Sequence, residues 1–188
     1  MTRFWRVVHL DPEQDDPWSQ GGALHVDPAW QGAGRFDIPK FAVTLYLAET
    51  AAAAVGETFA SVPTWSDDML WSGYTQRRRH LVAYEYTGSV VELDDAAFLA
   101  SRGYRPSDVV ARNRSRSQEL GLELWLDGIR TLRWWSSMRP EWRVVSIWAP
   151  VDGLRPWDGE IEVVGSTELS VDHPAVVVAA EAVCRIRT

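Results

Sequence analysis

A strand followed at once by an apolar helix, in residues 42–62, constrains the fold more than any other part of the chain. The aliphatic residues of AVTLYLA (42–48) alternate with Thr44 and Tyr46. This period of two predicts a strand that turns Tyr46 away from its aliphatic face. The strand must therefore bury one face against a core and present the other, with Tyr46, to a different environment.

The helix is expected over residues 51–62, between an N-cap at Thr50 and Pro63. Its residues are small or hydrophobic on every side, and helices of this kind tend to lie inside a protein. Glu57 is its only ionisable residue. Because a buried carboxylate needs a partner to offset its desolvation, and because such groups are often functional, Glu57 is a candidate site residue.

Length and charge narrow the class of protein. A chain of 188 residues fits one domain, expected to span residues 1–188. The formal net charge of -7 repels polyanions, so no direct nucleic-acid partner is expected. The arginines at 77–79 and at 112, 114 and 116 are interpreted as solvated faces, with contact to a phosphate-bearing small ligand as the alternative.

Targeting, disulfide and metal signals are absent from the sequence. The first residues, MTRFWRVVHL, carry charges where a secretory signal would be apolar, and no segment reaches transmembrane length. We therefore expect a cytoplasmic protein without a membrane partner. Cys184 is the single cysteine and is expected in the core. The four histidines lack metal-ligand spacing, so no metal is expected.

Strands and helices are mixed without a regular βαβ rhythm, which favours an α+β fold. Residues 11–34 are expected to form a long loop that covers a ligand, and Thr87-Gly88 predicts a hairpin between the strands 81–86 and 89–93. The remaining expected elements are strands at 4–10, 130–135, 144–148 and 161–165, and helices at about 94–103, 115–126 and 172–184.

Four motifs, in this order and spacing, resemble the RES domain family, which is named for arginine, glutamate and serine. They are Arg35 in GAGRF, Tyr46 in LYLAET, Glu57 in AVGETF and Ser136 in DGIRTLRWWSSMRP. The N-terminal FWRVVH extends the resemblance over nearly the whole chain.

The resemblance implies an ADP-ribosyltransferase-like fold, with a split, largely antiparallel β-sheet and flanking helices. It also implies a toxin that consumes NAD as a substrate by breaking the nicotinamide–ribose bond, with phosphate or water as acceptor. An Xre-type helix-turn-helix antitoxin is the implied partner. Transfer of ADP-ribose to a protein, and a non-catalytic interaction module, remain alternatives, and a homo-oligomer is compatible with the sequence.

The chemistry implied by the resemblance gives each residue a role. Glu57 would stabilise the positive charge that develops on the ribose. Arg35, or Arg6 from the neighbouring strand, would hold the pyrophosphate. Tyr46 offers a ring for nicotinamide to stack on, and Ser136 a hydroxyl that positions the ribose or the carboxamide.

The sequence leaves alternatives open for several of these residues. Without the resemblance, Arg35, Tyr46 and Glu57 also fit ordinary structural roles. Where the family often has Asn, this chain has Asp37, whose charge beside the expected phosphate site would lower affinity for NAD. Ser137 follows Ser136 directly, and either hydroxyl fits the site. Two further patterns, the Glu160-Ile161-Glu162 triplet and the tryptophans at 134, 135, 142 and 148, are interpreted as a solvent-facing strand and as packing.

Overall fold

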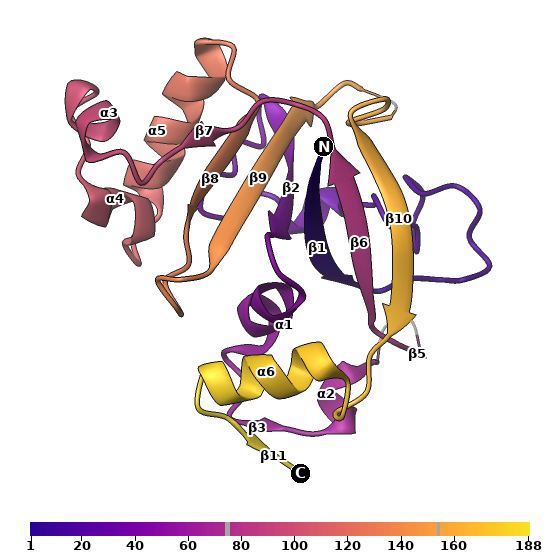
Figure 1. Ribbon diagram of the computed structural model, residues 1–188. Coiled ribbons are helices and arrows are strands. Elements are labelled where there is room, and N and C mark those ends of the chain that lie inside the picture. Colours follow the sequence, from indigo (N-terminus) through magenta and orange to yellow (C-terminus); the bar gives the residue numbers. More distant parts are fainter. Residues whose placement is uncertain (74–75, 154) are drawn as a thin grey trace.

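The computed structural model describes residues 1–73, 76–153 and 155–188. Within these residues the main sheet has seven strands in the order β10-β6-β1-β2-β9-β8-β7 (Figure 1). Its neighbouring strands pair antiparallel, except that β7 and β8 are parallel. The strands are β1 (Thr2–Val8), β2 (Ala42–Ala48), β6 (His80–Tyr86), β7 (Val91–Glu92), β8 (Thr131–Trp135), β9 (Arg143–Pro150) and β10 (Ile161–Glu168). The expected α+β class with a largely antiparallel sheet is confirmed.

The remaining elements are helices and short strands. The helices are α1 (Ala51–Phe59), α2 (Asp67–Leu70), α3 (Ala96–Ser101), α4 (Pro106–Val110), α5 (Ser115–Leu126) and α6 (Pro174–Ala182), with a 3-10 turn η1 (Pro28–Trp30). Two small sheets pair β3 (Thr64–Trp65) with β11 (Ile186–Arg187) and β4 (Trp71–Ser72) with β5 (Arg77–Arg78).

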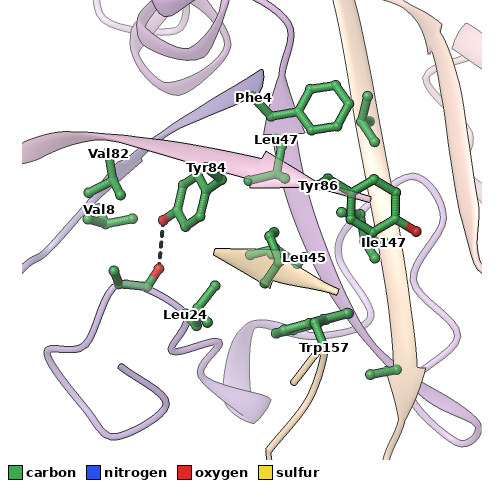
Figure 2. Close-up of a cluster of buried hydrophobic side chains, with 14 residues drawn as sticks. Phe4, Val8, Leu24, Leu45, Leu47, Val82, Tyr84, Tyr86, Ile147 and Trp157 are labelled. Carbon is green, nitrogen blue, oxygen red and sulfur yellow. Dashed lines mark hydrogen bonds between the residues drawn. The ribbon is translucent and has the colours of Figure 1, made fainter. Parts of the chain in front are cut away.

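One face of the main sheet is covered by chain segments without regular structure. Leu45 and Leu47 of β2 pack there with Tyr84 of β6, and Leu24 and Trp157 close the cluster from outside the sheet (Figure 2). The Tyr84 hydroxyl donates to the backbone oxygen of Ala23 at 2.7 Å, which ties residues 11–34 to this face. That loop has little regular structure, as predicted, since η1 is its only helical turn among the described residues.

Helices cover the opposite face in two groups. α1 and α6 pack together over one part of the sheet, and α3, α4 and α5 gather over another (Figure 1). The first group buries Val55 and Val176, and the second buries Leu120 and Leu124. These separate clusters leave the ends of α1 and α5 on either side of β2, where the cleft described below opens.

The sheet is split between β1 and β2. These strands share one ladder position, Trp5 with Ala48, whereas β1 pairs with β6 along its whole length. The side chain of Gln31 takes the place of β1 at the free edge of β2. Its Oε1 accepts from the Thr44 amide at 2.8 Å and its Nε2 donates to the Thr44 carbonyl at 3.3 Å.

Residues 42–59 form the predicted strand and helix, with a shorter helix than expected. The strand 42–48 is confirmed as β2. Thr50 is the N-cap of α1, and its hydroxyl accepts from the Ala53 amide at 3.1 Å. The helix ends at Phe59, before the predicted residue 62. The helix predicted at 115–126 is confirmed as α5, and Gly128 follows it with φ +86°.

The predicted hairpin around Thr87-Gly88 is wrong. Both edges of β6 are occupied, one by β1 and the other by β10. No edge is left for residues 89–93, so β7 pairs in parallel with β8 at the far side of the sheet. Local turn residues favoured a hairpin, but the non-local partners of β6 decide the pairing.

Smaller expectations at helix ends need correction as well. The helix expected from about residue 94 is α3, whose N-cap is Asp95, while the Asp94 carboxylate pairs with Arg143 at 3.1 Å. His173 is the N-cap of α6. Cys184 is exposed and not in the core, because it follows the end of α6 in a left-handed turn with φ 54°.

Candidate functional site

A cleft of about 390 Å³ opens between α1, β2, the end of β8 and the start of α5, and it brings together all five residues predicted for the site. They come from five different parts of the chain. The cleft is lined by Trp5, Arg6, Val7, Gly34, Arg35, Tyr46, Leu47, Ala48, Ala54, Glu57, Thr58, Arg114, Trp134, Ser136, Ser137, Met138 and Val144.

Ser136 fixes the carboxylate of Glu57. Its hydroxyl donates to Glu57 Oε1 and accepts from the Met138 amide at 2.8 Å. Ser136 is buried, whereas Ser137 is exposed, although both line the cleft. Of the two serines left open by the sequence, Ser136 is therefore the one that contacts the acid.

Glu57 lies on the open side of α1 and is not enclosed, which corrects the expectation of a helix buried all round. Glu57 and Thr58 are solvent-exposed, while Val55, Gly56 and Phe59 are buried. This difference arises because α1 packs on the sheet and on α6 but borders the cleft with its remaining face.

The surroundings of Glu57 still change its acidity. Partial desolvation by the cleft walls raises the pKa of the Glu57 carboxyl above its ordinary value. The hydrogen bond from Ser136 and the positive charge of Arg35 oppose this rise. The carboxylate is thus partly removed from water and oriented from one side, with its second oxygen available to a ligand.

Trp142 holds α1 beside the cleft. A Cβ placed on Gly56 would lie 2.2 Å from the Trp142 ring, so this close approach requires glycine. Trp142 is also tied to the serine, since its carbonyl accepts from the Ser136 amide at 2.9 Å. The same contact therefore sets the positions of both members of the Ser136–Glu57 pair.

Asp37 anchors the opposite wall and does not act as a free charge in the cleft. It is buried, with Oδ2 accepting from the amides of Gly32 and Gly34 at 2.7 and 2.6 Å. Its Oδ1 accepts from the Tyr46 hydroxyl at 2.7 Å. These donors surround its carboxylate, and Asp37 does not line the cleft. That its charge lowers affinity for NAD stays a prediction.

Tyr46 is held rigidly by these contacts. Its hydroxyl also accepts from the Phe36 amide at 2.9 Å, and its ring meets Trp134 edge-on at 6.3 Å between centroids. Burial and the neighbouring Asp37 raise the pKa of Tyr46 well above its ordinary value, so the phenol stays protonated. The cleft thus presents the fixed ring of Tyr46 as a flat wall.

Arg35 is fixed by backbone acceptors. Its Nη1 donates to the carbonyls of Val109 and Ala111 at 2.9 and 2.8 Å, at the end of α4. Burial lowers the pKa of Arg35, as does the nearby charge of Arg114, while Glu57 raises it. Arg35 and Glu57 therefore interact electrostatically across the cleft. The position of the Arg35 guanidinium is set by the carbonyls at the end of α4.

Arg6 and Arg114 complete a positive surface. Arg6 donates from Nη1 to the His25 carbonyl at 3.1 Å, and Arg114 lies at the N-terminus of α5. Sequence reasoning placed Arg114 with the solvated arginines and missed it as a site residue. The only signal was the alternative of a phosphate-bearing ligand. Together with Arg35 these side chains put three arginines beside one carboxylate.

The other arginines noted in the sequence serve elsewhere. Arg77 pairs with Asp11 at 2.6 Å, Arg78 with Asp67 at 3.0 Å, and Arg116 with Glu119 at 2.7 Å. These ion pairs agree with the interpretation of solvated faces for Arg77, Arg78 and Arg116. That interpretation is wrong for Arg79, which is partly buried with its guanidinium 5.3 Å from the centre of the Phe59 ring.

The two other sequence patterns lie outside the centre of the site. Glu160 and Glu162 are exposed at the edge strand β10 and do not line the cleft. Trp148 is buried among the residues under α5, and Trp134 packs in the same cluster with one side on the cleft. Packing is thus the main use of these tryptophans.

Metal and membrane features can be stated for the described residues only. Among residues 1–73, 76–153 and 155–188, no group of three or more His, Cys, Asp or Glu side chains is placed to hold a metal ion. In the same part of the chain, no helix is long and apolar enough to cross a membrane.

Comparisons with known proteins identify a family and a similar fold for this chain. The model of the RES domain family matches residues 3–157, which include every residue of the cleft. A chain of the M. tuberculosis MbcT-MbcA toxin-antitoxin complex has a similar fold, with a TM-score of 0.67 and 18% identity over 97% of this chain and 89% of that chain. A search of curated protein sequences finds no significant match. Because the family model matches most of its length, the chain belongs to the RES domain family.

Proposed function

We propose that this chain consumes NAD by cleaving the bond between nicotinamide and ribose. The observation that carries the proposal is the Ser136–Glu57 pair, which holds a carboxylate of raised pKa in a cleft with Arg6, Arg35 and Arg114. A fixed negative group beside a positive surface suits a substrate that is anionic in its pyrophosphate and becomes cationic at its reacting sugar.

The reaction follows from the charges. The bond between ribose C1′ and the nicotinamide nitrogen breaks, and its electron pair leaves with nicotinamide, which becomes neutral. C1′ gains oxocarbenium character, and ionised Glu57 stabilises that charge more in the transition state than in the substrate. An oxygen of water or phosphate then bonds to C1′. With water as acceptor, the proton lost from it passes to solvent.

The remaining residues bind and orient. The arginines would hold the pyrophosphate through charge-assisted hydrogen bonds. The ring of Tyr46 would provide a face for nicotinamide, since its hydroxyl is already bonded to Asp37. Ser136 would act through Glu57, because its hydroxyl donates to that carboxylate.

We further propose that the chain is the toxin of a toxin–antitoxin pair, acting in the cytoplasm where NAD is available. Membership of the RES family supports this assignment. The similar fold in the MbcT-MbcA toxin-antitoxin complex is consistent with it. The expected partner is an Xre-type helix-turn-helix antitoxin.

The test is to incubate the purified protein with NAD, with and without phosphate, and to measure free nicotinamide. Nicotinamide release without added protein supports the proposal, and a phosphate requirement identifies the acceptor. If NAD stays intact until a protein is added and becomes ADP-ribosylated, the chain is a protein ADP-ribosyltransferase. If NAD stays intact in every mixture, the catalytic proposal fails and a non-catalytic module remains.

A further inference from the structure

Helix α6 contacts both elements that carry the Ser136–Glu57 pair. It packs beside α1, which bears Glu57 (Figure 1), and its last carbonyl binds the loop 136–142 between β8 and β9, which begins with Ser136. We propose that Arg139 is a positioning residue, which fastens this loop to α6 and so holds the Ser136 hydroxyl against the Glu57 carboxylate. As a role in catalysis, this inference rests on the proposed function.

The backbone of Arg139 binds the two residues that set the position of the pair. Its amide donates to Ser136 Oγ at 3.3 Å, and its carbonyl accepts from the Trp142 amide at 3.0 Å. The Trp142 carbonyl in turn accepts from the Ser136 amide at 2.9 Å, and the Trp142 ring packs on Gly56, the residue before Glu57. The position of Arg139 in the loop therefore determines where Ser136 and Trp142 lie.

The side chain of Arg139 connects the loop to the end of α6. Its Nη1 donates to the carbonyl of Ala182, the last residue of the helix, at 3.1 Å. The last four carbonyls of a helix lack intrahelical donors and attract positive charge. In α6 the carbonyls of residues 179–181 accept from backbone amides, so Arg139 supplies the donor for the fourth. Glu141 also pairs with Arg139 Nε at 3.3 Å, which holds the guanidinium between the loop and the helix end.

A second arginine connects α6 to the helix that bears Glu57. Arg185, just after α6, donates from Nη2 to the carbonyl of Ala60, the C-cap of α1. Apolar side chains of α1 and α6 also pack in one buried cluster. We name the two contacts, Arg139 with Ala182 and Arg185 with Ala60, the α6 clamp. Through this clamp, one helix holds both the loop and α1.

The Ser136–Glu57 hydrogen bond bridges the two elements that the α6 clamp holds. Hydrogen bonds weaken steeply with poor geometry, so a small shift of either element would loosen this one. Neither Arg139 nor Arg185 lines the cleft, so both would act through the pair and not by contact with a substrate. The support of the site thus extends past residues 3–157, which the family model matches.

The first measurement needs no substrate. It is an NMR titration of the full chain, labelled at the glutamate carboxyl carbons, with Glu57→Gln to identify the signal of Glu57. The hydrogen bond from Ser136 and the charge of Arg35 lower the pKa of Glu57. Arg139→Met should loosen that hydrogen bond and move the titration to higher pH. Arg185→Met changes the other end of the clamp and should move it in the same direction, so either variant tests the inference if the other does not fold.

The Ser136→Ala background separates positioning from a direct effect of charge. If Arg139 acts through the serine hydroxyl, adding Arg139→Met to Ser136→Ala should leave the titration of Glu57 where Ser136→Ala alone puts it. A shift of the same size in both backgrounds would show that the arginine acts on the carboxylate directly, and it would overturn the positioning role.

Turnover of NAD is the second measurement. Arg139→Met should lower kcat by roughly 10–10²-fold, because a small misplacement of a catalytic group has effects of this size. KM should not change, since the arginines of the cleft are outside the clamp. Arg130→Met is the matched control, because Arg130 donates to the Trp125 carbonyl of α5 at 2.9 Å, at the opposite end of β8 from Ser136. It should change neither kcat nor the titration of Glu57.

The outcomes for the clamp and for the reaction are distinguishable. If the wild type leaves NAD intact but Arg139→Met shifts the titration of Glu57 only when Ser136 is present, the positioning of the carboxylate is supported and the proposed reaction fails. If the wild type cleaves NAD but the folded clamp variants titrate and turn over as the wild type or the Arg130→Met control does, the positioning role is overturned and the proposed reaction stands.

Discussion

The hydroxyl of Ser136 donates to the carboxylate of Glu57, a contact between residues 79 positions apart that joins the end of β8 to α1. The acceptor belongs to the exposed side of a helix, while the donor is buried and held by backbone amides. A rigid buried group thus orients a carboxylate that a ligand can reach. The proposed chemistry depends on this arrangement.

Removing the serine hydroxyl should change the pH dependence of the reaction. The hydrogen bond from Ser136 lowers the pKa of Glu57 against the larger effect of desolvation. Wild-type kcat/KM should therefore fall on the acid side with an apparent pKa above that of an ordinary glutamate, and Ser136→Ala should move this limb to still higher pH. Ser137→Ala should leave the limb in place. Overlapping acid limbs for Ser136→Ala and wild type would contradict the assignment.

The same raised pKa predicts how stability depends on pH. An acid whose pKa is higher in the folded state binds more protons there than in the unfolded chain, so the free energy of unfolding falls as pH rises through that interval. Glu57→Gln removes this contribution. The stability of the variant relative to wild type should increase from below the unfolded pKa of about 4.5 toward neutral pH.

Chemical denaturation of both proteins over this pH range measures the difference. A difference that stays constant with pH would show that the pKa of Glu57 is the same in the folded and unfolded states.

Asp37 should be important for the fold of the site. Asp37→Ala leaves the Tyr46 hydroxyl and the Gly32 and Gly34 amides without their acceptor. We expect it to lower the free energy of unfolding by about 1–3 kcal/mol. Asp37→Asn should cost less, because the amide oxygen can still accept from both glycine amides. Urea unfolding of the two variants checks the order, and an equal loss in both would contradict it.

Gly56 should tolerate no side chain. Alanine favours a helix by about 1 kcal/mol over glycine, but here its Cβ would lie 2.2 Å from the Trp142 ring. The overlap should outweigh the propensity, so Gly56→Ala should destabilise the protein by about 1–3 kcal/mol and lower turnover by displacing Glu57.

A double variant tests the cause of that loss. Adding Trp142→Leu removes the overlap, so the Gly56→Ala change should cost less stability in that background. The same cost in both backgrounds would show that Trp142 is not responsible.

The sequence predicted what depends on local pattern. The alternation in β2 and the cap at Thr50 were readable, and so were α5 and the turn at Gly128. Strand pairing was not readable from local signals. The turn at Thr87-Gly88 looks like a hairpin, yet β1 and β10 occupy both edges of β6.

The site residues also divide into those that sequence motifs predicted and those that depend on tertiary contacts. The family motifs identified five residues that line one cleft. Arg114 was missed because an arginine in a basic run has no local mark that separates it from solvated neighbours. The contacts of Asp37 could not be predicted from the sequence, because its partners, Gly32, Gly34 and Tyr46, come from a loop turn and a strand whose contact is tertiary.

The most direct test of the account is nicotinamide release from NAD by wild type and Glu57→Gln at equal concentration, with circular dichroism to verify that both are folded. The account predicts that the folded variant loses turnover by roughly 10²–10³-fold, the effect of removing one fixed electrostatic stabiliser of a transition state, and that it is less harmful to the cells that express it. A folded Glu57→Gln protein that releases nicotinamide as fast as wild type would contradict the account.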